Sequence, residues 1–298
     1  MSHFIGLPGI AIKPSRLGFF PLLGFVAALT CLLSPGVMHA QSPAESSANR
    51  PDANRPDKET VLTLYHAHQH RGETGQSLSY RIMSPAVIEP GKRYPLVLFL
   101  HGAGERGSDN AKQLVHGAAE FARDDRRQQY PAFVVFPQCP TDDKWVNVNW
   151  SEATGKRSLQ EEASSPMQLT IELVQSLQET LPVDPQRVYV TGLSMGGFGT
   201  WYAAAHHSQL FAAAAPVCGG GIPAWAPLYN GIPVWAFHGG ADSVVPVNRS
   251  REMISALALA GHTPEVRYVE YPGVNHDSWS ATFARDDFFQ WLFSQERK

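Results

Sequence analysis

The fold of this chain is constrained most strongly by short apolar runs that alternate with helical patterns. Seven runs have the length of a strand, at residues 77–85, 95–101, 132–138, 187–192, 212–218, 233–239 and 266–273. Several are apolar throughout, which is typical of strands buried on both faces of a parallel sheet. Helical spacing of apolar residues lies between them, at 110–122, 164–181, 196–207, 248–260 and 281–293. The pattern predicts an α/β fold, with a mostly parallel doubly wound sheet and helices on both faces.

Two local features refine this prediction. In the helix at 164–181, Ser165 is suited to the N-cap and Pro166 to the first helical position. The connection at 219–231 is short, so no large cap domain is expected there. In such a sheet, ligands bind at the carboxyl ends of the strands, so the residues that follow each strand are the functional candidates.

The first sixty residues differ in composition from the rest. Lys13 and Arg16 precede an apolar run, and Ala40 offers a small residue for cleavage. We therefore predict a secretory signal at 1–40 and export to the periplasm or the medium; the run is short for a membrane anchor. Residues 41–59 repeat ANRPD and contain almost no apolar residue, which predicts a disordered linker before a catalytic domain at 60–298.

The charge of the mature chain limits its partners. Cleavage removes two basic residues and no acid, so the net charge of −3 becomes −5. No basic tract remains that could contact a phosphate backbone, so nucleic acid is not an expected partner. No stable membrane association is expected after the signal is cleaved.

The glycine motif GAGERG at 102–107 matches the dinucleotide fingerprint G-x-G-x-x-G. A nucleotide site also needs a helix that opens on the glycines and an acidic residue at the end of the next strand. The helical pattern here begins several residues later, and the next strand ends in Gln138. The motif therefore does not predict a nucleotide site, and no organic cofactor is expected.

A second motif, G-x-S-x-G at Gly192–Gly196, lies between a buried strand and a helix. This is the context of a nucleophilic serine on a tight strand-to-helix turn, so Ser194 is the predicted nucleophile. Such a serine needs a histidine base oriented by an acid, in the chain order serine, acid, histidine. Asp242 and His276 each follow a later strand in that order. Asp242 could instead cap the helix that begins near Asn248.

The other histidines fit the role of base less well. They end a helix (His206 and His207), precede a strand (His262), or precede the acid (His238). An oxyanion needs one backbone N–H just after the serine and one from the loop after an earlier strand. Met195 supplies the first and Ala103 the second, with Gly104 as the alternative; Glu105 and Arg106 have no assigned role beyond stiffening the loop.

Three weaker features remain. His66, His68 and His70 would share one face of a strand and could bind zinc, but a solvated edge is favoured, so no metal is predicted. Cys139 and Cys218 follow strands that two others separate, so two buried thiols are expected rather than a disulfide. Trp145 and Trp279 are predicted to line the substrate cleft, with ordinary packing as the alternative.

Taken together, LVLFLHGAGERG, FPQCP, DPQRVYVTGLSMGGFGTW, PVCGGG, PVWAFHGGADSVVP and YPGVNHDSW resemble the α/β-hydrolase esterases. The resemblance covers residues 76–293 and is to secreted carboxylesterases related to polyhydroxybutyrate depolymerases, feruloyl esterases and dienelactone hydrolases. It implies an α/β-hydrolase fold and hydrolysis of small or polymer-attached esters through an acyl-enzyme. A secreted peptidase of the same fold and a non-catalytic binding protein are the alternatives, and the acyl and alcohol groups stay open.

Overall fold

A computed structural model describes residues 54–148, 163–262 and 266–297. The predicted signal at 1–40 and most of the predicted linker lie outside these residues. Within them, eight strands form one sheet in the order β1-β2-β4-β3-β5-β6-β7-β8. The strands are β1 (His66–Arg71), β2 (Ser77–Met83), β3 (Tyr94–Leu100), β4 (Phe133–Pro137), β5 (Val183–Leu193), β6 (Ala213–Val217), β7 (Val234–Gly239) and β8 (Val266–Tyr271).

The sheet is mostly parallel, as predicted. Strands β3 to β8 run parallel to one another, whereas β2 is antiparallel to both β1 and β4. The seven predicted runs correspond to β2–β8. Strand β1 is an addition at the edge of the sheet and carries the three histidines of the HAHQH segment.

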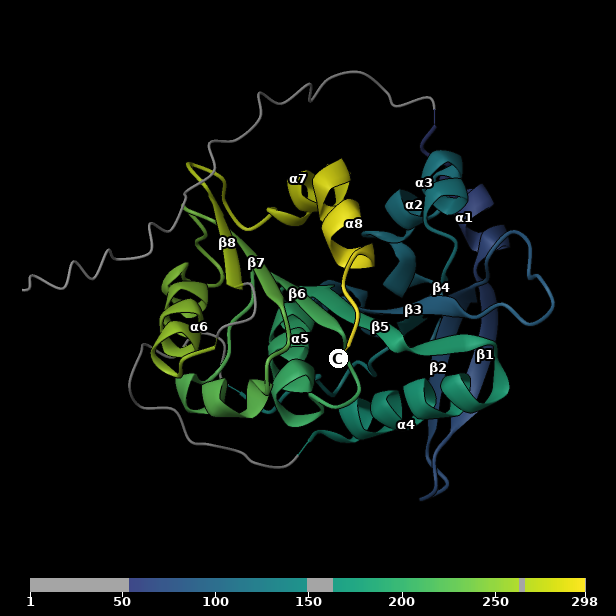
Figure 1. Cartoon of the computed structure of the whole chain (residues 1–298), viewed down its shortest axis with the longest axis horizontal. Helices are drawn as coiled ribbons and strands as arrows, with labels where there is room; N and C mark the ends of the chain where they lie inside the picture. Colours follow the sequence, from purple (N-terminus) through teal and green to yellow (C-terminus); the bar gives the residue numbers. More distant parts are fainter. Residues whose placement is uncertain (1–53, 149–162, 263–265, 298) are drawn as a thin grey trace, which may run out of the picture. The chain divides into compact units, whose positions relative to one another are not determined.

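Helices cover both faces of the sheet (Figure 1). One face carries α4 (Ser165–Thr180), α5 (Met195–His206) and α6 (Asn248–Leu259). The other carries α1 (Lys58–Leu64), α2 (Ala118–Phe121), α3 (Asp124–Gln129), α7 (Trp279–Ala284) and α8 (Asp286–Phe293). Each face has its own core, and alternate residues of β3 enter them: Leu96, Leu98 and Leu100 enter one, and Val97 and Phe99 the other.

Three helix predictions need correction. Residues 110–122 are not one helix, because Gly117 has a φ of 80° and separates the 3₁₀ turn η2 (Lys112–Leu114) from α2. The pattern at 281–293 is divided between α7 and α8 by Arg285, whose backbone is extended. The N-cap of α4 is Ser164 rather than Ser165, since the Ser164 side chain accepts from the Met167 N–H.

The chain is also ordered slightly earlier than predicted. Helix α1 begins at Lys58, and the Asp57 side chain caps it by accepting from the Thr60 N–H. The expected domain start at residue 60 therefore falls inside a helix. In the described ranges, no helix is both long and apolar enough to cross a membrane.

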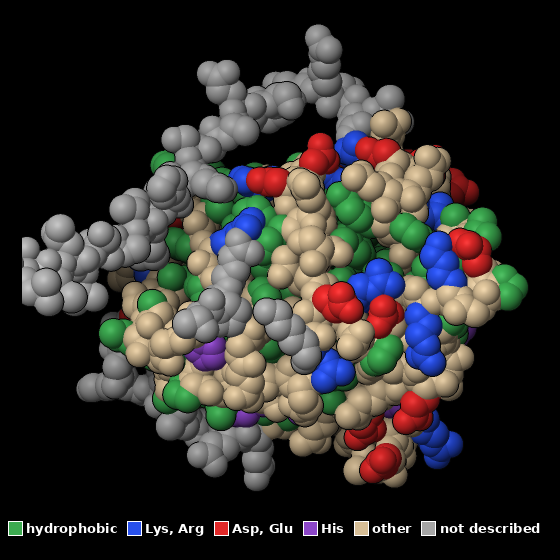
Figure 2. Space-filling model, in the orientation of Figure 1, with side chains coloured by type: hydrophobic (Ala, Val, Ile, Leu, Met, Phe, Trp, Pro, Cys, Tyr) green, Lys and Arg blue, Asp and Glu red, His purple; other side chains and the backbone are tan. Residues whose placement is uncertain are grey.

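The functional edge of the sheet is formed by the carboxyl ends of β3 to β8. Two further 3₁₀ helices lie there, η1 (Ala103–Glu105) after β3 and η3 (Pro223–Tyr229) between β6 and β7. The short η3 connection agrees with the expectation that no cap domain is inserted at this point. Figure 2, in the same view as Figure 1, shows acidic and basic side chains intermixed on the face toward the reader.

Candidate active site

Ser194 stands on the turn between β5 and α5. Its φ is 53° and its ψ is −117°, a conformation that a residue with a side chain adopts only when its surroundings enforce it. The Ser194 N–H donates to the Val217 carbonyl at 3.0 Å. A Cβ on Gly192 would lie 2.5 Å from the Leu100 carbonyl oxygen, and one on Gly196 would overlap the same oxygen. The motif needs these glycines because the turn packs directly on the end of β3.

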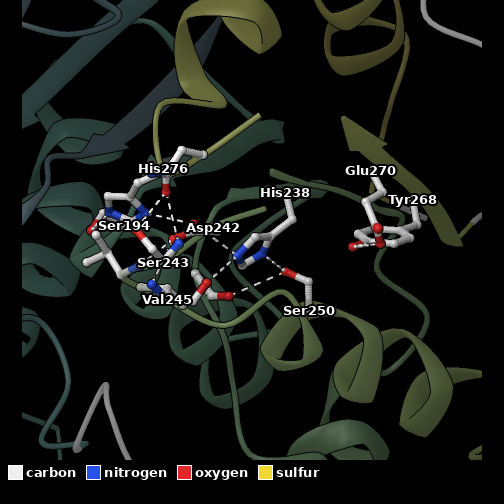
Figure 3. A network of polar contacts seen from close by, with 12 residues as sticks. Ser194, His238, Asp242, Ser243, Val245, Ser250, Tyr268, Glu270 and His276 are labelled. Carbon is white, nitrogen blue, oxygen red and sulfur yellow. Dashed lines mark hydrogen bonds and ion pairs between the residues drawn. The ribbon is translucent and has the colours of Figure 1, made fainter. Parts of the chain in front are cut away.

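The three side chains predicted as a triad lie in one hydrogen-bonded sequence (Figure 3). His276 Nε2 is 2.9 Å from Ser194 Oγ, and His276 Nδ1 is 2.7 Å from Asp242 Oδ2. A carboxylate only accepts, so Nδ1 carries the proton and Nε2 accepts from the serine hydroxyl. Asn275 Oδ1 accepts from the N–H groups of both Ser243 and His276, at 2.9 and 2.8 Å. The loops that carry the acid and the base are thus tied together.

The Asp242 side chain is fully buried and is kept ionised by its donors. Burial by itself would raise the pKa of Asp242. Side-chain hydrogen bonds from His238 and His276 oppose this effect, as do the N–H groups of Val244 and Val245. The two N–H groups donate to Oδ1 at 2.9 and 2.8 Å. Together the donors hold the pKa well below its usual range, so the acid stays charged beside the base.

His238 is a second histidine on the same acid (Figure 3). It is fully buried, and its Nε2 is 3.3 Å from Asp242 Oδ2 and 3.0 Å from the Val245 carbonyl oxygen. Both neighbours are acceptors, so Nε2 carries the proton. Nδ1 is 2.7 Å from Ser250 Oγ, which also lies 3.3 Å from the Gly219 carbonyl oxygen.

The contact of His238 with Asp242 is not among the predictions, because His238 precedes the acid in the chain. A usable signal was nevertheless present: His238 is the penultimate residue of β7 and lies at the same edge of the sheet as Ser194. His276 rather than His238 contacts Ser194, and the position of His238 near the end of β7 brings it next to Asp242.

Met195 and Ala103, the predicted oxyanion donors, each occupy the first position of a helix. Met195 begins α5 directly after Ser194, and Ala103 begins η1 directly after Gly102. The N–H of a first residue has no acceptor within its own helix. The loop of Ala103 borders the nucleophile, since a Cβ on Gly102 would lie 3.6 Å from Ser194 Cβ. The alternative donor, Gly104, is the next residue of η1.

His101 sets the direction of this loop, and the sequence analysis did not identify it. Its Nε2 accepts from the Cys139 N–H at 2.9 Å, so its proton lies on Nδ1, which is 2.6 Å from the Gly102 carbonyl oxygen. That carbonyl shares a planar trans peptide with the Ala103 N–H, which therefore points the opposite way. Burial lowers the pKa of His101 to about 4, so the ring is neutral near pH 7.

Two more side chains brace the loop, Arg106 from within it and Gln138 from the end of β4. The Arg106 guanidinium donates through Nε to the Ala103 carbonyl at 2.9 Å and through Nη1 to the Asp143 carbonyl at 3.2 Å. The Gln138 side chain donates to the Glu105 carbonyl at 3.2 Å. Arg106 therefore has the stiffening role considered for it, and the glycine loop is held from both β3 and β4.

The two tryptophans predicted to line the cleft differ in position. Trp145 is fully buried, and its Nε1 donates to the His101 carbonyl at 3.0 Å. The prediction for Trp145 is wrong, because this side chain supports the end of β3 from within the core. Trp279 is half-buried; its ring is edge-on to His276 at 5.4 Å between centroids and lies 5.2 Å from the His116 ring. It remains a candidate for substrate contact.

The two cysteines lie beside the site as buried thiols, whereas the histidine strand lies at the far edge of the sheet. Cys139 and Cys218 are buried and unpaired, with β3 and β5 between their strands. Burial raises the pKa of both thiols, so they stay protonated. His66, His68 and His70 lie on edge strand β1, and among the residues described no group of three or more histidine, cysteine or acidic side chains could hold a metal ion.

Comparison with known proteins assigns the chain to a family. The family model described as "Putative esterase" matches residues 72–284 of the 298. The match covers well over half of the chain and includes Ser194, Asp242 and His276. The chain belongs to this esterase family.

The similarity extends to individual esterases. Poly(3-hydroxyalkanoate) depolymerase C of Paucimonas lemoignei is 30% identical over 208 residues, or 58% of this chain and 47% of that protein. An uncharacterized secreted protein of Arthroderma benhamiae is 27% identical over 252 residues, or 72% of this chain and 25% of that protein. The chain thus spans between a quarter and a half of the length of these relatives.

A solved structure agrees with the family assignment. The crystal structure of a thermostable esterase superposes with a TM-score of 0.73 at 36% identity, covering 80% of this chain and 64% of that one. The predicted α/β-hydrolase fold and the resemblance to esterases are confirmed.

Proposed function

We propose that this esterase-family protein is an exported serine carboxylic-ester hydrolase with the triad Ser194, His276 and Asp242. The observation that carries the proposal is the continuous chain of hydrogen bonds from Ser194 Oγ through His276 to Asp242, at 2.9 and 2.7 Å. Similarity to a poly(3-hydroxyalkanoate) depolymerase supports ester hydrolysis as the reaction.

The reaction follows from the positions of these atoms. His276 Nε2 takes the Ser194 proton as Oγ attacks the ester carbonyl carbon, and Asp242 stabilises the imidazolium that forms. The tetrahedral oxyanion accepts hydrogen bonds from the N–H groups of Met195 and Ala103. Its collapse expels the alcohol, which takes the proton from His276, and leaves the acyl group on Ser194. Water, deprotonated by His276, then releases the acid. No metal or organic cofactor takes part.

We infer the substrate class and the location from separate features. Within the described residues, the short connection at η3 holds no cap domain, which suits small or polymer-attached esters better than a lipid tunnel. The predicted signal at 1–40 and the relative named as a secreted protein support export.

Replacement of the nucleophile tests the proposal. Ser194→Ala is expected to lower kcat/KM for 4-nitrophenyl butyrate by about 1,000-fold or more, because it removes the hydroxyl that His276 contacts. Ser255→Ala, which removes an exposed hydroxyl on α6, is the matched control and should keep the wild-type rate. Full esterase activity in Ser194→Ala, or activity on short peptides instead of esters, would contradict the proposal.

A further inference from the structure

Glu105 is a carboxylate beside the nucleophile that the proposed reaction does not use. It belongs to η1, two residues after Ala103. Gly102 lies between Glu105 and Ser194. A Cβ placed on Gly102 would be 2.9 Å from Glu105 Oε2 and 3.6 Å from Ser194 Cβ. The Glu105 side chain is only 13% exposed. The carboxylate is therefore folded back over Gly102, near both the Leu193 side chain and Ser194, rather than directed into solvent.

No closely bonded cation cancels this charge within the described part of the chain. The neighbouring cation, Arg106, is directed to the carbonyl oxygens of Ala103 and Asp143. The ion-pair partner of Glu105 is His116, with 3.7 Å between His116 Nε2 and Glu105 Oε1, which is too long for a hydrogen bond. Glu105 consequently exerts its field on whatever binds at Ser194.

Ring contacts join the loop of Glu105 to the loop of the base. The His116 ring packs on Trp279 at 5.2 Å, and Trp279 packs edge-on against His276 at 5.4 Å. Asp277, the carboxylate next to the base, is exposed and bonds to the N–H and hydroxyl of Ser280 at 3.1 and 3.0 Å. An ester held at Ser194 thus lies close to Glu105, and no cation described on these two loops offsets the charge of Glu105 there.

We propose that Glu105 determines which substrate charge the site accepts. It rejects esters that carry an anionic group near the scissile carbonyl and admits neutral or cationic ones. This role rests on the proposed ester hydrolysis at Ser194. At a separation of about 6 Å and an effective dielectric constant of about 40, two like unit charges disfavour binding by about tenfold. The expected substrates are therefore uncharged or basic in the part that faces η1.

A matched pair of esters tests this role. Mono-4-nitrophenyl glutarate carries a terminal carboxylate, and 4-nitrophenyl 5-methylhexanoate is its neutral isostere. In Glu105→Gln, kcat/KM for the glutarate should rise about tenfold, whereas that for the neutral ester should change less than about threefold. A gain in activity on one ester does not arise from damage to the loop. Rates are corrected for hydrolysis without enzyme.

Glu89→Gln is the control, since Glu89 is an exposed carboxylate paired with Lys92 before β3, at the edge of the sheet opposite Ser194. It should leave both rates unchanged. In the wild type, the preference for the neutral ester should shrink as NaCl is raised, because salt screens the repulsion. A glutarate rate that does not rise in Glu105→Gln, an equal fall for both esters, or a preference insensitive to salt would overturn the role of Glu105. Wild-type protein inactive on both esters would instead refute the proposed hydrolysis.

Discussion

Asp242 is the residue that contacts both histidines of the site. Its Oδ2 faces two imidazole rings, His276 at 2.7 Å and His238 at 3.3 Å, while its Oδ1 accepts two backbone N–H groups. A carboxylate with this many donors is fixed in direction as well as in charge. We therefore regard His238 as a positioning residue that acts through Asp242, since it contacts neither the nucleophile nor the base directly in the hydrogen-bonded sequence.

Two variants of His238 test this view. His238→Leu removes the N–H beside Oδ2 and should lower kcat about tenfold with little change in KM, because His238 does not touch the substrate. His238→Gln can present an N–H at nearly the same reach and should recover much of the loss. Kinetics with 4-nitrophenyl butyrate measure both values. Equal losses in the two variants, or a wild-type kcat in His238→Leu, would exclude a positioning role.

At the scale of elements, the strands were predictable because each is a local run of apolar residues bounded by turn residues. Strand β1 was not among them, since its polar HAHQH sequence is stabilised by pairing with β2 rather than by burial. The ends of the helices were harder to predict, because they depend on backbone conformation more than on composition. Gly117 was visible in the sequence, but its positive φ, which divides the pattern at 110–122, was not.

The site, like the fold, was predictable only in part. Ser194, Asp242 and His276 could be chosen because each follows a strand whose carboxyl end meets the same edge of the sheet. His101 could not, because its role depends on a hydrogen bond with Cys139, at the end of a strand distant in sequence. The position of His238 near the end of β7 was a signal, but its contact with Asp242 became visible only in the structure. Trp145 follows β4 at a similar position, yet the core takes up its side chain.

For the whole molecule, the tight packing of the functional edge has a consequence for stability. His101 is buried between the ends of β3 and β4, and burial lowers its pKa to about 4 from an ordinary value of 6.5. Between these two values the unfolded chain binds a proton that the folded chain does not. The contribution of His101 to the free energy of unfolding is therefore fully present above pH 6.5 and is lost as the pH falls toward 4.

Denaturant unfolding at several pH values tests this statement. The free energy of unfolding should fall by about 3 kcal/mol between pH 6.5 and 4 through His101 alone. His101→Asn, which keeps a donor near the Gly102 carbonyl but does not titrate, should show a shallower slope over the same range. Identical slopes in the two proteins would mean that His101 does not contribute to the loss.

The central claim is that Ser194 Oγ is the nucleophile that carries the acyl group in an acyl-enzyme. Covalent labelling of Ser194 tests this claim most directly. The protein is incubated with a fluorophosphonate, and the modified peptide is identified by mass spectrometry. We predict one stoichiometric adduct on Ser194, blocked by a competing ester substrate and absent from Ser194→Ala, with loss of esterase activity in step with labelling. A protein that hydrolyses esters while Ser194 stays unlabelled would contradict the account.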